Sequence, residues 1–234
     1  NLDGADLSGA SLNGATLGTT NGIDGIRATT SFAGANLAGT SFLGVTFGAI
    51  FSKDIIGEPI LPVVWKLVNG QIVGPNAQLQ DANLANADLD GVDLSAARLW
   101  GVKSGGISGT PTLSNDWRLI NGYLVGPGAD LEGADLRSAD LSWLDLLEIK
   151  GTPLLPQGWF SGNGKIVRKV HGFGWIDLSG SDFTGQDLSN VEFIGFNLDG
   201  ANFTNCNLSG AVFDEARLNN AVFSGANLAN TDFS

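Results

Sequence analysis

A bulky apolar residue returns at every fifth position from Ile176 to Ser234, and this period limits what the chain can fold into. The series alternates between leucine and phenylalanine: Leu178, Phe183, Leu188, Phe193, Leu198, Phe203, Leu208, Phe213, Leu218, Phe223, Leu228 and Phe233. A period of five fits neither an α-helix nor a strand, so no regular amphipathic element can keep these side chains on one face. It fits a coil that turns a corner every five residues. The pattern therefore predicts a solenoid, whose turns bury their apolar sides by stacking on one another.

The alternation of phenylalanine and leucine predicts how many sides each turn has. A three-sided turn would hold fifteen residues and stack Phe183 on Leu198, so that every column mixed the two residue types. A four-sided turn would hold twenty residues and stack Phe183 on Phe203 and Phe223. Uniform columns give every layer the same shape, which close packing favours. We therefore predict an all-β solenoid with a four-sided cross-section.

Short runs of a small residue, Asp or Asn, and then Leu or Phe recur along the whole chain. Examples are Ala5-Asp6-Leu7, Ala35-Asn36-Leu37, Ala134-Asp135-Leu136 and Ala226-Asn227-Leu228, together with the double unit from Ala82 to Leu89. In these motifs the chain resembles the pentapeptide repeat family. The resemblance implies a right-handed quadrilateral β-solenoid in which the central residue and the small residue point inward. It implies little about function, because a fold does not fix an activity.

The repeats begin at Leu2 and end at Phe233, and this continuity predicts one elongated domain over residues 1–234. A degenerate stretch from Gly18 to Thr30 keeps the five-residue register, so we expect it to form two imperfect sides of a turn. The composition, with 34 Gly, no Met and 15% charged residues, is typical of a turn-rich β protein.

Three segments that interrupt the repeats, at about residues 58–73, 110–125 and 152–167, are copies of one another. Each has a Pro, a Trp six residues later (Trp65, Trp117 or Trp159), and then Asn-Gly before two aliphatic residues. Asn-Gly between short apolar segments is the strongest local signal of a two-residue hairpin turn, since both positions need positive φ. The sequence therefore predicts three tandem β-hairpin insertions. The third is expected to be the weakest, because residues 159–162 do not alternate regularly.

The spacing inside these segments predicts where the hairpins go. Gly57 and Gly74 are separated by seventeen positions, as are Gly109 and Gly126, and seventeen is not a multiple of five. The simplest interpretation is that the chain crosses one side of the wall and sends about twelve residues outward as a projecting hairpin. An isolated two-stranded hairpin is marginally stable in water, so each Trp is expected to pack its indole on the wall.

Few residues suggest chemistry. His171 is the single histidine, so no histidine-based metal cluster and no Ser-His triad can form within one chain. Cys206 occupies a small inward position of the repeat and is interpreted as a buried apolar residue. The numerous Asp residues are explained by the repeat itself. We therefore predict no catalytic, cofactor-binding or metal-binding residues, and no enzymatic activity.

The ends of the chain and its hydropathy bear on its location. No apolar run approaches the ~20 residues needed to span a bilayer, so no membrane insertion is expected. The sequence has neither an initiator Met nor a signal peptide, and the chain is expected to be a processed or excised piece. Its composition leans slightly toward an exported or luminal bacterial protein.

A formal net charge of −12 points away from direct nucleic-acid binding and from anionic membranes. The favoured hypothesis is a non-enzymatic structural or protein-interaction scaffold with projecting, Trp-containing hairpins. The alternative is a DNA-mimicking modulator of DNA gyrase or topoisomerase, as the resemblance to gyrase-shielding family members implies. The candidate partner surface consists of Trp65, Lys66, Trp117 and Arg118, and the expected partner is a protein. Self-association through uncapped solenoid ends is a further expectation.

Overall fold

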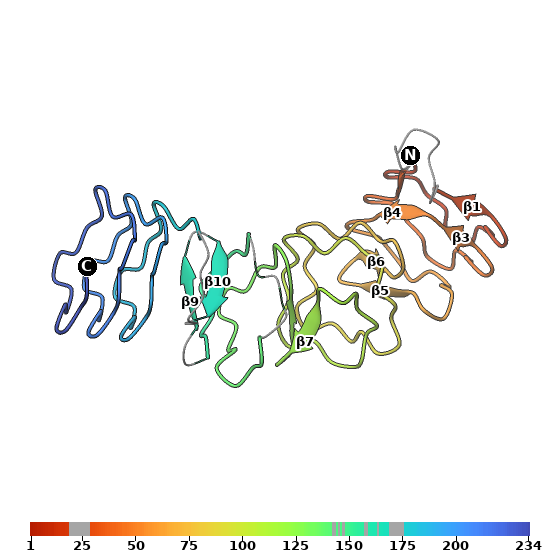
Figure 1. The fold of residues 1–234 in the computed structure, drawn as a ribbon. Coiled ribbons are helices and arrows are strands. Elements are labelled where there is room, and N and C mark those ends of the chain that lie inside the picture. The colour runs from red at the N-terminus through yellow and green to blue at the C-terminus, as the bar shows by residue number, and fades with distance from the viewer. Residues whose placement is uncertain are drawn as a thin grey trace. The chain divides into compact units, whose positions relative to one another are not determined.

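The computed structural model describes residues 1–18, 29–141, 144, 146, 148–156, 159–162, 164–168 and 176–234. These residues form an all-β solenoid, and no helix occurs among them (Figure 1). The chain divides into two compact units. The first consists mainly of Asn1–Ala134, and the second mainly of Asp135–Leu141 and Leu146–Ser234. Within the described residues, no helix has the length and apolar character needed to cross a membrane.

The C-terminal wall, residues 176–234, is the most regular part of the second unit. Its parallel bridges join residues at a constant separation of twenty positions: Asp177↔Asn197, Asp182↔Asn202, Asp187↔Asn207, Asn197↔Arg217, Asn202↔Val222 and Asn207↔Asn227. Backbone hydrogen bonds accompany each bridge, as where the Leu178 amide donates to the Asn197 carbonyl over 2.8 Å. These turns are the blue coils of Figure 1. With a period of five, each such turn contains four repeats.

Phenylalanine rings form two columns in the core of this wall. Phe183, Phe203 and Phe223 stack with centroids 5.0 Å apart and interplanar angles of 15° and 9°. In the second column, Phe193 and Phe213 stack at 4.9 Å, and Phe213 and Phe233 at 5.1 Å. The columns meet edge to face, as between Phe203 and Phe213 at 5.8 Å and 83°. Both geometries suit the quadrupole of an aromatic ring. The predicted phenylalanine columns are confirmed.

The small inward position of the repeat also supplies hydrogen bonds between layers. The thiol of Cys206, which is 1% exposed, donates to the Phe183 carbonyl over 2.7 Å. Thr231 Oγ1 donates in the same way to the Leu208 carbonyl at 2.9 Å. In both pairs the acceptor precedes the donor by the same number of positions. Burial raises the pKa of the Cys206 thiol. Cys206 is therefore a buried structural residue, as its place in the repeat indicates.

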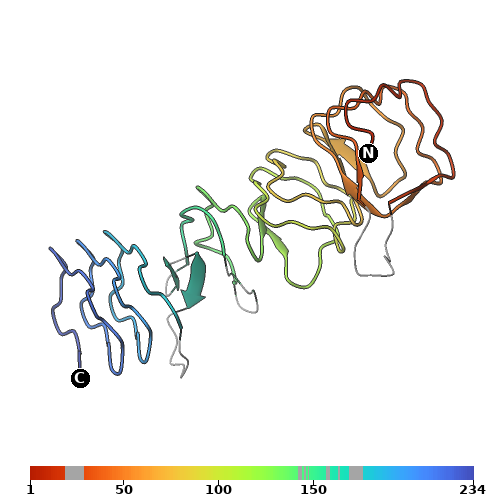
Figure 2. The same ribbon diagram turned by 90° about the horizontal axis from the view of Figure 1, so that it is seen from above.

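The first unit begins with parallel pairs of strands. Strand β1 (Thr16–Leu17) pairs with β3 (Thr46–Phe47), and β2 (Thr29–Ser31) pairs with β4 (Ala49–Phe51). Thr16 pairs with Thr46, a separation of thirty positions, whereas Thr29 pairs with Ala49, a separation of twenty. The first turn is thus longer than the regular turn by two repeats. Figure 2 shows these N-terminal turns in red and orange.

The expectation that Gly18 to Thr30 forms two imperfect sides of a turn stays a prediction. Residues 19–28, on which most of that prediction falls, lie outside the described part of the chain.

Three antiparallel pairs of strands flank the three Asn-Gly positions, as predicted. They are β5 (Lys66–Val68) with β6 (Gln71–Val73), β7 (Arg118–Ile120) with β8 (Tyr123–Val125), and β9 (Trp159–Gly162) with β10 (Lys165–Arg168). Asn69 and Gly70 have φ of 48° and 73°, and Asn121 and Gly122 have φ of 50° and 78°. Positive φ at both positions is what a two-residue primed turn requires. In the third pair, Asn163 lies outside the described residues.

The antiparallel pairs lie in the solenoid wall, and the prediction that they project outward is wrong. Ile72 and Val73 of β6 and Leu124 and Val125 of β8 are fully buried. The Ile55 amide donates to the Gly70 carbonyl over 3.0 Å, which ties the tip of the first pair to the chain before it. An aliphatic pair after Asn-Gly stabilises the fold most when it is buried, so the returning strand becomes part of the core.

The number of sides that the first two interruptions cross also differs from the prediction. Ile50 pairs with Ala77, and Lys103 pairs with Asp130, so both bridges span twenty-seven positions. An interrupted turn therefore exceeds the regular turn of twenty by seven, whereas a one-side crossing would make it exceed that turn by twelve. The seventeen positions from Gly57 to Gly74, and from Gly109 to Gly126, thus replace two sides of the wall. Spacing alone could not reveal this, because seventeen differs from five and from ten by lengths that a hairpin can absorb.

Candidate functional site

The two tryptophans of the candidate partner surface are packed inward. Trp65 is 7% exposed, and its ring lies 4.4 Å from that of Phe47. A Cβ atom at Gly74 would lie only 2.3 Å from Trp65 Cδ2, so the indole packs against the bare glycine backbone. Trp117 is 8% exposed and packs in the same way on Gly126, where a Cβ would lie 2.4 Å from its Cδ2.

The glycine that receives each indole follows from the strand register. Lys66 pairs with Val73, so Trp65 and Gly74 come next on the two strands. Arg118 pairs with Val125 and brings Trp117 to Gly126 in the same way. The sequence signal for this arrangement is a Gly nine residues after the Trp. In the sequence alone, this Gly only marks the end of the seventeen-position interruption.

The two basic residues of the candidate surface bind to their own surroundings. Lys66 Nζ donates to Asp88 Oδ2 over 2.8 Å and to the Asp88 carbonyl over 3.3 Å. The hydrogen bond from Lys66 is the main reason why the pKa of Asp88 is lowered. Arg118 Nη1 donates to the carbonyl oxygens of Asn115 and Trp117, at 2.9 and 2.8 Å.

The structure does not bring the four predicted residues into one exposed surface. Among the described residues, no ring contact joins Trp65 to Trp117. Both indoles are occupied in stabilising the antiparallel pairs, and Lys66 and Arg118 remain as the accessible part of the candidate surface. The prediction that both tryptophans belong to an exposed partner surface is wrong. A Trp beside a hairpin turn can pack on either face of the hairpin, and the glycine opposite determines the face on which it packs.

The Asp and Asn residues of the repeat cap the turns of the wall. Each accepts the backbone N–H two residues further on, which is the geometry of an Asx turn. The pairs include Asp6 with Ser8, Asn36 with Ala38, Asn83 with Ala85, Asp93 with Ser95, Asp187 with Ser189, Asn202 with Thr204 and Asn227 with Ala229. The Ser8 amide is the main reason why the pKa of Asp6 is lowered. These carboxylates therefore have a structural role that accounts for their number.

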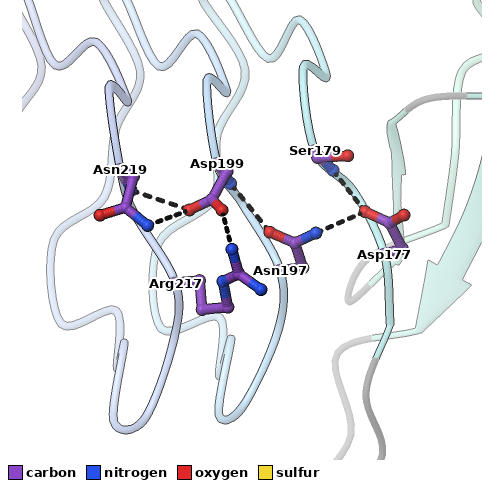
Figure 3. A network of polar contacts seen from close by, with 6 residues as sticks. All are labelled: Asp177, Ser179, Asn197, Asp199, Arg217 and Asn219. Carbon is purple, nitrogen blue, oxygen red and sulfur yellow. Dashed lines mark hydrogen bonds and ion pairs between the residues drawn. The ribbon is translucent and has the colours of Figure 1, made fainter.

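Figure 3 shows how such side chains connect one turn of the C-terminal wall to the next. Asp177 accepts the Ser179 amide and Asn197 Nδ2, each at 3.0 Å. One turn further on, Asp199 Oδ1 accepts the amide and the Nδ2 of Asn219, at 2.9 and 3.0 Å. Arg217 forms an ion pair with the other oxygen of Asp199, at 2.5 Å. The network is built so that each carboxylate faces donors in the neighbouring turn.

Acidic residues of the C-terminal wall pair with neutral residues in the neighbouring turn. Asn207 Nδ2 donates to Asp187 over 3.0 Å, and Asn227 Nδ2 donates to Asn207 over 3.1 Å. Stacked strands lie about 4.8 Å apart, so a column of aspartates would place like charges next to one another. Among the bridges of the described residues, no acidic residue pairs with another acidic residue. A chain with a net charge of −12 thereby avoids the closest repulsions.

Chemically reactive groups do not gather in the described residues. No group of three or more His, Cys, Asp and Glu side chains there could hold a metal ion. His171 lies outside the described residues.

The third antiparallel pair is attached differently from the first two. Trp159 is only half-buried, whereas Phe160 is 3% exposed and contacts the rings of Phe183 and Phe193 at 6.1 and 5.4 Å. A Cβ at Gly162 would lie 2.5 Å from Phe183 Cε1, so this glycine gives the ring its space. The position that corresponds to Gly74 holds Arg168.

Comparison with known proteins supports the repeat interpretation. The family model described as pentapeptide repeats matches in eight copies, over residues 1–24, 75–103, 127–146, 173–205 and 197–234, which is more than half of the chain. No curated protein matches the sequence.

Two solved structures illustrate the likeness. HetL, a pentapeptide repeat protein involved in heterocyst differentiation regulation from the cyanobacterium Nostoc sp. strain PCC 7120, is 22% identical, with 99% of this chain and 86% of that chain covered and a TM-score of 0.18. A trypsin-treated form of QnrB1, a plasmid-mediated fluoroquinolone resistance protein, is 13% identical with a TM-score of 0.23. That alignment covers 99% of this chain and 66% of the QnrB1 chain. Both TM-scores are low, so the likeness rests on the sequence repeats.

Proposed function

Since the chain belongs to the pentapeptide repeat family, we propose that it is a non-enzymatic scaffold that binds a protein partner through loops held on a rigid wall. We further propose that the wall is a single right-handed, four-sided coil interrupted by three hairpins. The evenly spaced bridges of the C-terminal wall and the Asn-Gly turns of the antiparallel pairs support this form. The right hand is what the family resemblance implies.

The observation that carries the scaffold function is that the wall keeps its structure while its loops change. Residues 55–65 and 107–117 precede the first two antiparallel pairs, and we call them the first loop and the second loop. Both have the same sequence of buried and exposed positions. Both end with the Trp amide donating to a carbonyl three residues earlier, from Trp65 to Pro62 and from Trp117 to Ser114. Residues that can vary on a constant backbone are typical of binding surfaces.

The runner-up is a DNA-mimicking modulator of DNA gyrase or topoisomerase. The net charge of −12 favours it. A DNA mimic needs a continuous line of negative charge, and columns such as Asp187, Asn207 and Asn227, where neutral residues follow a single Asp, work against such a line. A gyrase supercoiling assay separates the two proposals: we expect no inhibition by the purified chain, and inhibition would favour the mimic.

The scaffold function is tested by quantitative affinity capture from cells that make the protein. Wild type is compared with a variant in which Lys66 and Arg118 are replaced by Gln, and with one in which the first loop carries the residues of the second. We expect a defined set of proteins that one of the variants no longer retains. Identical retention by all three would count against binding through these loops. Self-association through the coil ends, where Phe233 is 49% exposed, would instead appear as concentration-dependent sedimentation.

A further inference from the structure

The first loop exposes aliphatic side chains at positions where the second loop is polar. Ile56, Ile60, Val63 and Val64 are 59%, 50%, 97% and 40% exposed. The corresponding residues of the second loop are Ser108, Thr112, Asn115 and Asp116, and all four are exposed as well. We call the four aliphatic residues the first-loop surface. Two more differences lie among them, because exposed Glu58 takes the place of Thr110 and Pro62 that of Ser114.

Folding does not explain these aliphatic residues. Ile60 donates its amide to the Thr40 carbonyl over 2.8 Å, and Thr112 donates to the Val92 carbonyl over 2.9 Å. Ile56 pairs with Asn36 in the wall as Ser108 pairs with Asp88. The second loop thus makes both of these backbone contacts with polar side chains at the corresponding positions. Clustered exposed aliphatic residues that the fold does not need are typical of an interaction site.

Neighbouring residues extend the apolar character of this surface. Leu43, which is 51% exposed, follows Phe42, whose amide donates to the Ile60 carbonyl over 2.9 Å. The second loop has no equivalent of this residue in the turn beside it: Leu94 donates to Thr112 in the same way, and Ser95 follows it. Exposed apolar residues of two adjacent, hydrogen-bonded turns therefore lie at the first loop.

We propose that the first-loop surface binds a partner protein that presents an apolar face with Lys or Arg at its rim. This inference rests on the scaffold function and names its binding site and the chemistry of its partner. Val63, almost fully exposed, supplies apolar contact, and Glu58 supplies a carboxylate among the aliphatic residues. A basic rim complements both Glu58 and the net charge of −12. A second copy of this chain would carry the same net charge, and an anionic membrane would repel it.

The test uses a random peptide library displayed on phage, selected on the full wild-type chain. The patch variant carries Ile56→Ser, Ile60→Thr, Val63→Asn and Val64→Asp, so that the first-loop surface takes the four corresponding residues of the second loop. The matched reciprocal variant carries Ser108→Ile, Thr112→Ile, Asn115→Val and Asp116→Val. A third variant, Glu58→Thr, isolates the charge. Circular dichroism and the urea midpoint establish that each variant is folded.

We expect selected peptides to combine aliphatic or aromatic residues with Lys or Arg. The patch variant should bind them about tenfold or more weakly, as expected for loss of an apolar contact centre. The reciprocal variant should gain a second binding site. The Glu58→Thr variant should bind more weakly at low salt, with a difference that shrinks as salt screens the charge.

Other outcomes would overturn the proposal in distinguishable ways. Peptides that bind wild type and the patch variant equally would place the binding site elsewhere and leave the scaffold function standing. A wild-type dimer in sedimentation equilibrium that the patch variant lacks would make a second copy the occupant. If wild type floats with phosphatidylcholine vesicles and the patch variant does not, the first-loop surface binds a lipid surface instead of a protein. Failure to select any peptide on any variant would count against the scaffold function itself.

Discussion

The C-terminal wall and the interrupted wall of the first unit use the same repeat but are stabilised in different ways. In the C-terminal wall, identical rings stack at 4.9 to 5.1 Å, and the column continues from one turn to the next. In the first unit, the turns after β4 contain antiparallel pairs that are fixed by one large side chain over a glycine, as with Trp65 on Gly74. The comparison teaches that a solenoid tolerates an interruption when a local contact replaces the column.

The largest expected effect is the loss of a stacked ring from the C-terminal wall. Phe203 is fully buried between Phe183 and Phe223, so Phe203→Ala should lower the free energy of unfolding by about 3 to 5 kcal/mol. Thr204→Ala is the matched control on the next residue, which faces outward and should cost less than about 1 kcal/mol. Urea denaturation measures both. Equal midpoints for the two variants would show that the column does not carry the stability of this wall.

A smaller effect is expected where the first unit relies on a single contact. Gly74→Ala places a methyl group 2.3 Å from Trp65 Cδ2, so something must shift, and it should destabilise the protein by about 1 to 3 kcal/mol. In a Trp65→Leu background, the same substitution should cost much less. The double-mutant cycle in urea measures this coupling. An equal cost in both backgrounds would mean that the glycine is needed for some other reason.

Much of the C-terminal wall could be predicted from the sequence, because its period is strict and each Phe has a like residue one regular turn away. The Asn-Gly turns were predictable too, since few other dipeptides readily adopt positive φ at both residues. The packing of the antiparallel pairs was not. It depends on Gly74 facing Trp65, and on the Ile72 amide donating to the buried Ser52 hydroxyl over 2.7 Å. Both contacts are set by three-dimensional register, and a sequence period of five carries no information about them.

The candidate site shows the same division. Trp65 and Trp117 were expected to pack their indoles on the wall, and both are buried, so they could not also form the exposed partner surface. The sequence does contain a signal for the first-loop surface. When the first loop is aligned with the second, Ile56 corresponds to Ser108 and Val63 corresponds to Asn115. Exposure was needed to interpret it, because an aliphatic residue in a loop can equally well be buried.

A third prediction tests the polar columns that the two walls share. Asn207→Asp would put a carboxylate beside Asp187, and like charges side by side should destabilise the C-terminal wall by about 0.2 to 1 kcal/mol. Asn83→Asp is the control at the same repeat position in the first unit, where the paired residue is Lys103 and no such cost is expected. Thermal denaturation at low and high salt compares them. A cost that is equal in both walls, or independent of salt, would contradict the role given to pairing Asp with a neutral residue.

The smallest expected effect concerns the exposed ion pair of Asp135 and Arg137 in the second unit. Arg137 Nε and Nη2 donate to the two carboxylate oxygens at 2.9 and 2.7 Å. This side-chain contact, followed by the backbone amide of Arg137, lowers the pKa of Asp135 from 3.8 to about 2. Because the folded pKa is the lower one, the contribution to stability is fully present above pH 3.8 and is lost as the pH falls through about 2.

Arg137→Gln keeps the backbone amide, so the pKa of Asp135 should rise while staying below 3.8. The titration of the carboxyl carbon by NMR measures the shift in both proteins. An unchanged pKa in the variant would assign the lowering to the turn alone, which is the contact that Asp6 makes with Ser8 in the first unit.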